Sequence, residues 1–238
     1  RKQAHALQRS LAGLLGATAL ANFANGLGVL DEAHVLFWRQ MGMLGELAQP
    51  AALLYSGLAF LRPSERLGHP SMLWPARMTA WTGGLLIILT LTGHVFQLNE
   101  LEGGQTAVGL VSLGGRISCI FVVIGMALGL AQLELVLSAS REPARYQLKF
   151  ILIGLGGLAA YHIYYASQIL LFPLWQTKYV LSGALVTMIA LALISFGLAR
   201  TRLREVVVNA YISQQALLGS IAFIVTGLYL LVIGVAGE

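Results

Sequence analysis

The chain has 238 residues, of which 57% are hydrophobic and 11% charged, with a single cysteine and a mean hydropathy of +0.76. A soluble globular domain carries charge on roughly a quarter of its residues, so this composition excludes that class, as well as a disordered chain and a disulfide scaffold. It predicts an all-α polytopic membrane protein. A membrane-spanning β-barrel would require alternation of apolar and polar residues, which is absent.

Seven apolar stretches predict about seven transmembrane helices in one helical domain over 1–238. Each stretch is long enough to cross roughly 30 Å of hydrocarbon as a helix, and little chain remains for a separate soluble domain. The chain begins without Met and stops directly after an apolar run, so we expect it to be a portion of a longer protein. The predicted spans are 10–30, 37–61, 79–98, 108–133, 148–172, 179–199 and 216–236.

The positions of Lys and Arg predict the orientation. Cytoplasmic connections retain basic residues, and alternate connections of this chain hold most of them. We therefore expect a multi-pass protein of the bacterial inner membrane with a cytoplasmic N-terminus and no nucleic-acid partner. The basic residues on that side are Arg1, Lys2, Arg9, Arg62, Arg66, Arg77, Arg141, Arg145, Lys149, Arg200, Arg202 and Arg204.

Two charged residues lie deep inside predicted spans. Glu46 and Arg116 both fall roughly 12–14 Å below the outer boundary, counted at 1.5 Å per residue from the ends of their spans. An ionised side chain at such a depth needs a partner, a water-filled cavity or a functional role. The sequence therefore predicts a buried ion pair between Glu46 and Arg116, in which the guanidinium offers its planar fork to the carboxylate.

Further polar groups occupy the outer halves of other spans. His162 reaches a depth similar to that of the charged residues, His94 lies nearer the outer surface, and Tyr161 and Tyr165 share a helical face with His162. One interpretation is a ligand pocket or a proton-sensitive switch. The other is a network that fixes helix register. The candidate residues are Asn22, Asn25, Glu46, His94, Arg116, Tyr161, His162 and Tyr165.

Several chemistries are disfavoured by spacing. Haem held by two histidines requires ligands at one depth, whereas His94 and His162 differ by roughly 9 Å. No nucleophile with its base and no paired aspartates occur in the spans, so we expect no catalytic residue, no metal and no cofactor.

Residues 154–159 match G-x-G-x-x-A, yet they lie within an apolar helix, where small residues indicate helix packing rather than a dinucleotide loop. Gly125-x-x-x-Gly129 and Gly13-x-x-Gly16 carry the same signal of close helix packing.

Two segments resemble a known family. The run 145–172, with its Arg-aromatic-x-x-Lys entry and its Gly-Leu-Gly-Gly helix, is similar to the membrane region of PrsK-type histidine kinases of the PEP-CTERM/exosortase system. The segments 212–218 and 226–231 resemble that family's Val-Ser-Arg-Gln and Gly-Leu-Tyr-Leu-Leu segments, and Glu134 falls in its Leu-Glu-Gln-Leu-Tyr-Arg segment. His162 stands where the family usually has Asp, and Gln214 where it has Arg.

The resemblance implies a non-catalytic sensory or anchoring domain, like the input region of such a kinase, that signals by shifts among packed helices. The kinase's phosphoacceptor helix and ATP-binding domain have no counterpart in the 238 residues, so we expect no enzymatic activity from this chain alone. Two alternatives stay open: an accessory structural subunit of a photosynthetic or respiratory complex, and a small transporter. The expected partners are membrane lipids, a second copy of the chain or a larger membrane-protein complex.

Overall fold

The computed structural model describes residues 2–60, 73–93, 95–100, 106–109, 113–139, 144–172 and 177–200. In these ranges the chain forms a bundle of six long helices with one short 3₁₀ turn and one two-stranded hairpin. The helices are α1 (Lys2–Leu30), α2 (Val35–Ala59), α4 (Leu73–Leu91), α5 (Leu113–Ala139), α6 (Ala144–Leu171) and α7 (Thr177–Arg200). The 3₁₀ turn is η1 (Glu32–His34), and the strands are β1 (Gln97–Glu100) and β2 (Thr106–Gly109).

The predicted helical membrane bundle is confirmed in its class but not in its count. Four helices are long and apolar enough to cross a membrane, over Leu7–Leu30, Leu113–Ser138, Leu148–Leu171 and Tyr179–Ala199. The described ranges hold six long helices rather than seven, and the predicted span 216–236 lies outside them. Among the two helices that do not qualify, α2 carries both Arg39 and Glu46, which lower its hydropathy.

The predicted bounds of two spans were wrong. The third helix ends at Leu91, not 98, and the next begins at Leu113, not 108. Gly93 adopts a positive φ of 79°, a conformation that glycine tolerates and that ends helices. The intervening apolar residues enter an antiparallel hairpin in which Gln97 pairs with Gly109 and Glu100 with Thr106, so apolar character there reflects a strand and not a span.

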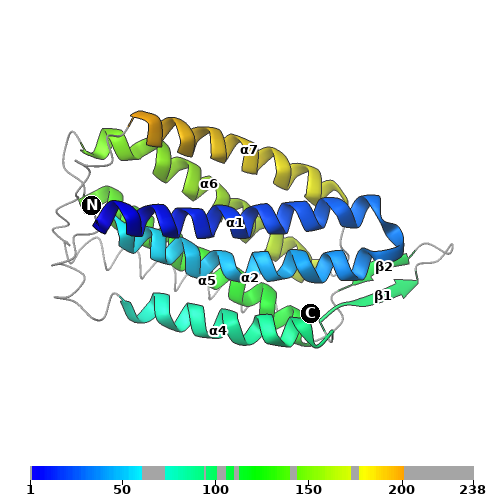
Figure 1. Cartoon of the computed structure of the whole chain (residues 1–238). Coiled ribbons are helices and arrows are strands. Elements are labelled where there is room, and N and C mark those ends of the chain that lie inside the picture. Colours follow the sequence, from blue (N-terminus) through cyan, green and yellow to red (C-terminus); the bar gives the residue numbers. More distant parts are fainter. Residues whose placement is uncertain are drawn as a thin grey trace.

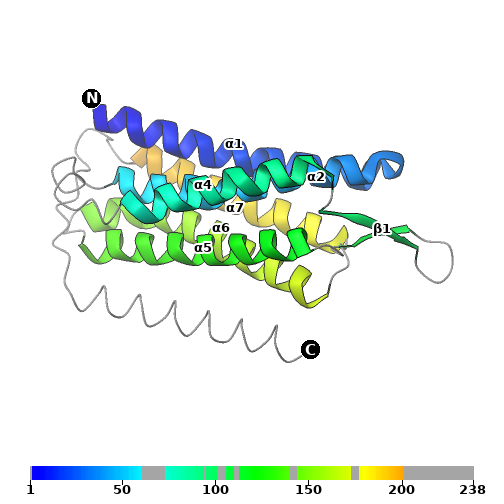
Figure 2. The ribbon, with the colours of Figure 1, turned by 90° about the horizontal axis from the view of Figure 1, so that it is seen from below.

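The helices are arranged as a closed ring of five with one helix outside it. α1 packs against α2, α2 against α5, α5 against α6, α6 against α7, and α7 returns to α1. α4 packs on the outer side of α2 and α5. The hairpin projects from the end of the bundle that holds the turn between α1 and α2, opposite the N-terminus (Figures 1 and 2).

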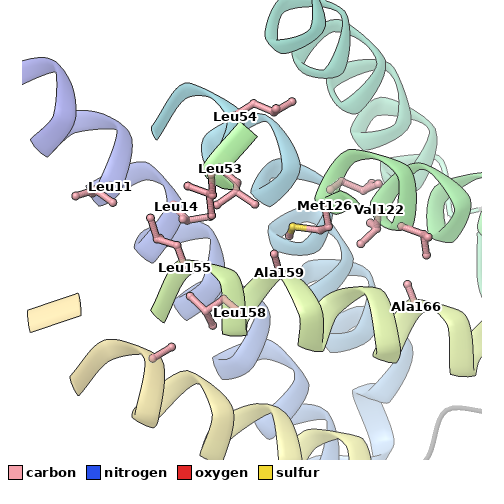
Figure 3. Close-up of a cluster of buried hydrophobic side chains, with 14 of the residues drawn as sticks. Leu11, Leu14, Leu53, Leu54, Val122, Met126, Leu155, Leu158, Ala159 and Ala166 are labelled. Atoms are coloured by element: carbon pink, nitrogen blue, oxygen red, sulfur yellow. The ribbon is translucent and has the colours of Figure 1, made fainter. Parts of the chain in front are cut away.

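The interior of the ring is apolar over much of its length. Leu11 and Leu14 of α1 meet side chains from α2, α5 and α6, among them Leu53, Met126 and Leu155 (Figure 3). Burying such side chains stabilises a helix bundle mainly through dispersion where the surroundings are lipid, because lipid is as apolar as the core.

Glycines allow close approach at several helix contacts. A Cβ added at Gly125 would lie 2.6 Å from Cβ of Pro50, and one added at Gly154 would lie 2.9 Å from the carbonyl oxygen of Ala190. The helix-packing interpretation of 154–159 is therefore confirmed at Gly154, which lies inside α6 against α7. The described residues do not test the same interpretation at Gly13 and Gly16, because Cβ atoms added there would meet nothing within 4 Å in that part of the chain.

Charge is distributed unevenly between the two ends of the bundle. Arg9, Arg77 and Lys149 lie within the first eight residues of α1, α4 and α6, at the end where α7 finishes. The other end carries Asp31, whose carboxylate accepts hydrogen bonds from the indole N–H of Trp38 at 3.0 Å and from the ring of His34 at 3.1 Å. These bonds hold the pKa of Asp31 below its ordinary value. Lys2, Arg145 and Arg200 lie in the terminal turns of α1, α6 and α7 at this same basic end, and the other predicted orientation residues lie outside the described residues, namely Arg1, Arg62, Arg66, Arg141, Arg202 and Arg204.

Candidate functional site

A charged pair is buried in the N-terminal half of α2. Arg39 donates from Nη1 to Glu46 Oε1 at 2.6 Å and from Nη2 to Glu46 Oε2 at 3.2 Å. The two residues are seven positions apart, so they lie on one face of the helix two turns from each other. Arg39 is 1% exposed and Glu46 is 4% exposed. This bidentate arrangement compensates both charges in a site from which solvent is almost excluded.

The first helix contributes to the same pair. Asn25 accepts a hydrogen bond from Arg39 Nη1 at 2.9 Å and donates one to Glu46 Oε1 at 3.1 Å. Gly42 lies between the two charged residues on α2, and a Cβ there would fall 2.5 Å from Asn25 Oδ1. The missing side chain of Gly42 therefore lets the amide of Asn25 reach the ion pair.

The predicted pair between Glu46 and Arg116 is not formed. Arg116 is exposed in the first turn of α5, and Glu46 is bound by Arg39 instead. The depth argument failed because α5 begins at Leu113, so Arg116 lies at the end of the bundle and not deep inside it. Sequence reasoning missed the ion pair between Arg39 and Glu46, which forms within a single helix. The signal for it was the i, i+7 spacing of opposite charges in α2.

Aromatic rings enclose the guanidinium of Arg39. Its Cζ lies 5.2 Å from the centroid of Phe96 and 5.6 Å from that of Tyr165, within the range of cation–π attraction. Phe96 precedes β1 and is buried, so the segment leading into the hairpin covers the charged pair. Arg39 Nε has no hydrogen-bond partner in the described part of the chain.

The predicted cluster on α6 is present. The ring of His162 bonds through Nδ1 to the carbonyl oxygen of Leu158 at 2.8 Å, and His162 is 5% exposed. The rings of Tyr161 and Tyr165 stack at 6.1 Å, and Tyr165 meets Tyr179 of α7 edge to face at 5.9 Å. The hydroxyl of Tyr165 is buried and has no partner among the described residues.

Polar contacts join α7 to α6 and to α1 at this level. The hydroxyl of Tyr161 donates to the carbonyl oxygen of Tyr179 at 2.6 Å. The amide of Asn22 on α1 donates to the hydroxyl of Thr187 at 3.1 Å. Together with the bonds of Asn25, these contacts connect α1, α2, α6 and α7 through side-chain polar groups.

A small polar cavity lies among these four helices. About 20 Å³ is open to the centre of a water molecule, which is enough for one or two waters. The structure brings six of the eight candidate residues to its wall. Arg116 lies apart from it, and His94 lies outside the described residues. The wall is formed by Ala21, Asn22, Asn25, Glu46, Tyr161, His162, Tyr165, Tyr179, Val180 and Gly183.

The chemistry of the wall favours a small, neutral, hydrogen-bonding guest. Arg39 already neutralises Glu46, so any further cation at the wall has to share this carboxylate with Arg39. In the ranges that the structure describes, no group of three His, Cys, Asp or Glu side chains could hold a metal ion. Cys119 is buried in α5 without a disulfide partner.

Replacing Tyr161 with Phe tests the contact between α6 and α7. We expect Tyr161→Phe to lower the free energy of unfolding by about 1 kcal/mol, because the hydrogen bond from α6 to the carbonyl oxygen of Tyr179 is lost and only the donor Ser182 of α7 itself remains among the side chains. Thermal unfolding of the purified protein in mild detergent, followed by circular dichroism, measures the change. Tyr164→Phe is the control, since Tyr164 is 53% exposed, and its variant is expected to unfold like the wild type.

Comparison with known proteins identifies no relative. No protein-family model, no curated protein and no solved structure matches this chain.

Proposed function

We propose that this chain is a non-catalytic sensory domain of a membrane protein, like the input region of a PrsK-type histidine kinase. The observation that supports this proposal most directly is the polar cluster around the cavity. Its hydrogen bonds join α1 to α2 and to α7 and join α6 to α7, and it includes a charged pair that is nearly free of solvent. A change in those bonds would alter the packing of α1, α2, α6 and α7 against one another.

Such a cluster suits signalling better than transport or catalysis. Packed cores and buried polar networks tend to have discrete arrangements, so a small event at the cluster can shift whole helices. The cavity is water-sized, whereas pockets for small organic molecules measure about 300–1,000 Å³. We place the domain in the bacterial inner membrane with the N-terminal end of α1 in the cytoplasm, because basic residues gather at that end of the bundle.

Purification from native membranes tests the proposal. The full natural protein is extracted in mild detergent, and everything that accompanies it is identified by mass spectrometry. We expect the chain to be recovered as part of a histidine kinase polypeptide or in stable association with one. Stoichiometric recovery with the subunits of a photosynthetic or respiratory complex would contradict the sensory role.

A charge variant tests whether the cluster carries the signal. We expect Glu46→Gln to change the autophosphorylation rate of the associated kinase in membrane vesicles by about tenfold, because the variant breaks the bonds that join the helices. Glu134→Gln is the matched control, since Glu134 is exposed on α5 away from the cavity. Equal rates for both variants and the wild type would contradict this role of the cluster.

One observation favours the alternative of an accessory subunit. Trp81 lies near the middle of α4 and is 78% exposed, although tryptophans that face lipid prefer the ends of membrane helices. Tryptophan is also common at the centres of protein interfaces. A partner that covers this face of α4 would be found by the same purification.

A further inference from the structure

We propose that the cavity between α1, α2, α6 and α7 is a proton-binding site, in which His162 takes up a proton at Nε2 and an enclosed water links the resulting imidazolium to Glu46. The inference rests on the proposed function only in naming the proton as the signal. The binding of the proton itself depends on the residues of the cavity.

The first step concerns the tautomer of His162. Nδ1 of the ring lies 2.8 Å from the carbonyl oxygen of Leu158, and a carbonyl oxygen can only accept a hydrogen bond. Nδ1 therefore carries the hydrogen in the neutral ring, and Nε2 keeps a free lone pair. Since His162 lines the cavity, this lone pair is the basic atom available to a molecule inside it.

The second step concerns the occupant of the cavity. The space fits a water molecule and has polar walls on several sides, which is the condition for a stable buried water. Tyr165 also lines the cavity and is only 5% exposed, and its buried hydroxyl has no hydrogen-bond partner in the described ranges. A water that accepts from Tyr165 and donates to Nε2 would satisfy both groups.

The third step concerns charge. The titratable groups that face the cavity are Tyr161 and Tyr165 beside His162 on α6, Tyr179 on α7 and Glu46 on α2; the α1 wall offers the uncharged Asn22 and Asn25. Arg39 lies behind Glu46, and Cys119 of α5 is buried nearby. Glu46 is therefore the one acidic side chain of the described residues on this wall, and a buried imidazolium requires such a counterion.

Proton uptake would set two cations in competition for one carboxylate. A proton from bulk water enters through the cavity and binds to the lone pair of Nε2, no covalent bond to carbon changes, and His162 gains one positive charge. Glu46 then shares its two oxygens between Arg39 and the hydrated imidazolium. The bidentate bond within α2 weakens, and α2 becomes attached to α6 through Glu46, which alters the contact between these two helices.

Nitrogen NMR of the histidine side chains tests the inference. The full chain, labelled with ¹⁵N in its five histidines, is placed in lipid nanodiscs and titrated from about pH 8 to about pH 5. The signals of His162 are those missing from His162→Gln. We expect the Nδ1–H tautomer at the alkaline end and a ring protonated on both nitrogens at the acidic end. An Nε2–H tautomer, or a ring that stays neutral until the protein unfolds, would overturn the inference.

A variant of the counterion provides the second readout. In Glu46→Gln we expect the proton affinity of His162 to fall about tenfold or more, because an opposite charge nearby has been removed. Asp31→Asn removes an acid at the turn between α1 and α2 and is expected to leave the midpoint unchanged. An unchanged midpoint in Glu46→Gln would overturn the link to Glu46. If that variant does not fold, the tautomer and titration of the wild type still decide the question.

The outcome is separable from that of the sensory proposal. A proton bound at His162 in a chain that purifies with subunits of a bioenergetic complex would support the site and contradict the sensory function. A neutral His162 in a chain attached to a kinase would contradict the site and leave the sensory function standing.

Discussion

Arg39→Met is expected to lower the free energy of unfolding by about 3–5 kcal/mol, because it leaves the carboxylate of Glu46 buried without its cation. Glu46 is 4% exposed, and its other side-chain partner in the described ranges is the amide of Asn25. Denaturant unfolding of the purified protein in mild detergent, followed by circular dichroism, measures the loss. A loss below about 1 kcal/mol would mean that water reaches the pair.

Two further variants distinguish the effect of breaking the ion pair on stability from the general effect of losing an arginine. The double variant Arg39→Met with Glu46→Met is expected to recover most of the lost stability, because apolar side chains of similar volume can replace a buried ion pair. Arg116→Met is expected to change the free energy of unfolding by no more than about 0.5 kcal/mol, since Arg116 is exposed at the start of α5. A large effect at Arg116 would restore the pair predicted from the sequence.

Gly45→Ala is expected to separate α1 from α2. A Cβ at this position would lie 2.5 Å from the carbonyl oxygen of Ala17 and 2.8 Å from the backbone nitrogen of Ala21, and backbone atoms of a helix cannot move aside alone. We expect a loss of about 1–3 kcal/mol in the free energy of unfolding, the usual cost of overpacking. The same denaturant titration measures it.

The control variants for Gly45→Ala are expected to change the free energy of unfolding in the opposite direction. Gly13→Ala and Gly16→Ala add the same methyl group to α1 at positions where none of the described residues lies within 4 Å. Alanine is favoured over glycine inside a helix by about 0.5–1 kcal/mol, so these variants should be slightly more stable than the wild type. Destabilisation at Gly13 or Gly16 equal to that at Gly45 would show that the face of α1 with Gly13 and Gly16 is covered by another helix.

The sequence by itself determined the class of the protein and the neighbourhood of its site. Long apolar runs with few charges are sufficient to predict helices, because a helix satisfies every backbone hydrogen bond within one segment. The shared face of Tyr161, His162 and Tyr165 follows from the helical period alone. Their depth, together with that of Asn22, Asn25 and Glu46, predicted one polar cluster, and the structure brings these six of the eight candidate residues around one cavity.

The partner of Glu46 was decided only by the tertiary structure. Depth along a helix can be counted from the sequence, but the count depends on where the helix begins, and the hairpin moved the start of α5 to Leu113. Arg39 and Glu46 share one face of α2, and Gly42 and Gly45 let α1 approach α2, which brings Asn25 to the pair. Such contacts depend on which helices are neighbours, and the apolar pattern of each separate helix carries no information about its neighbours.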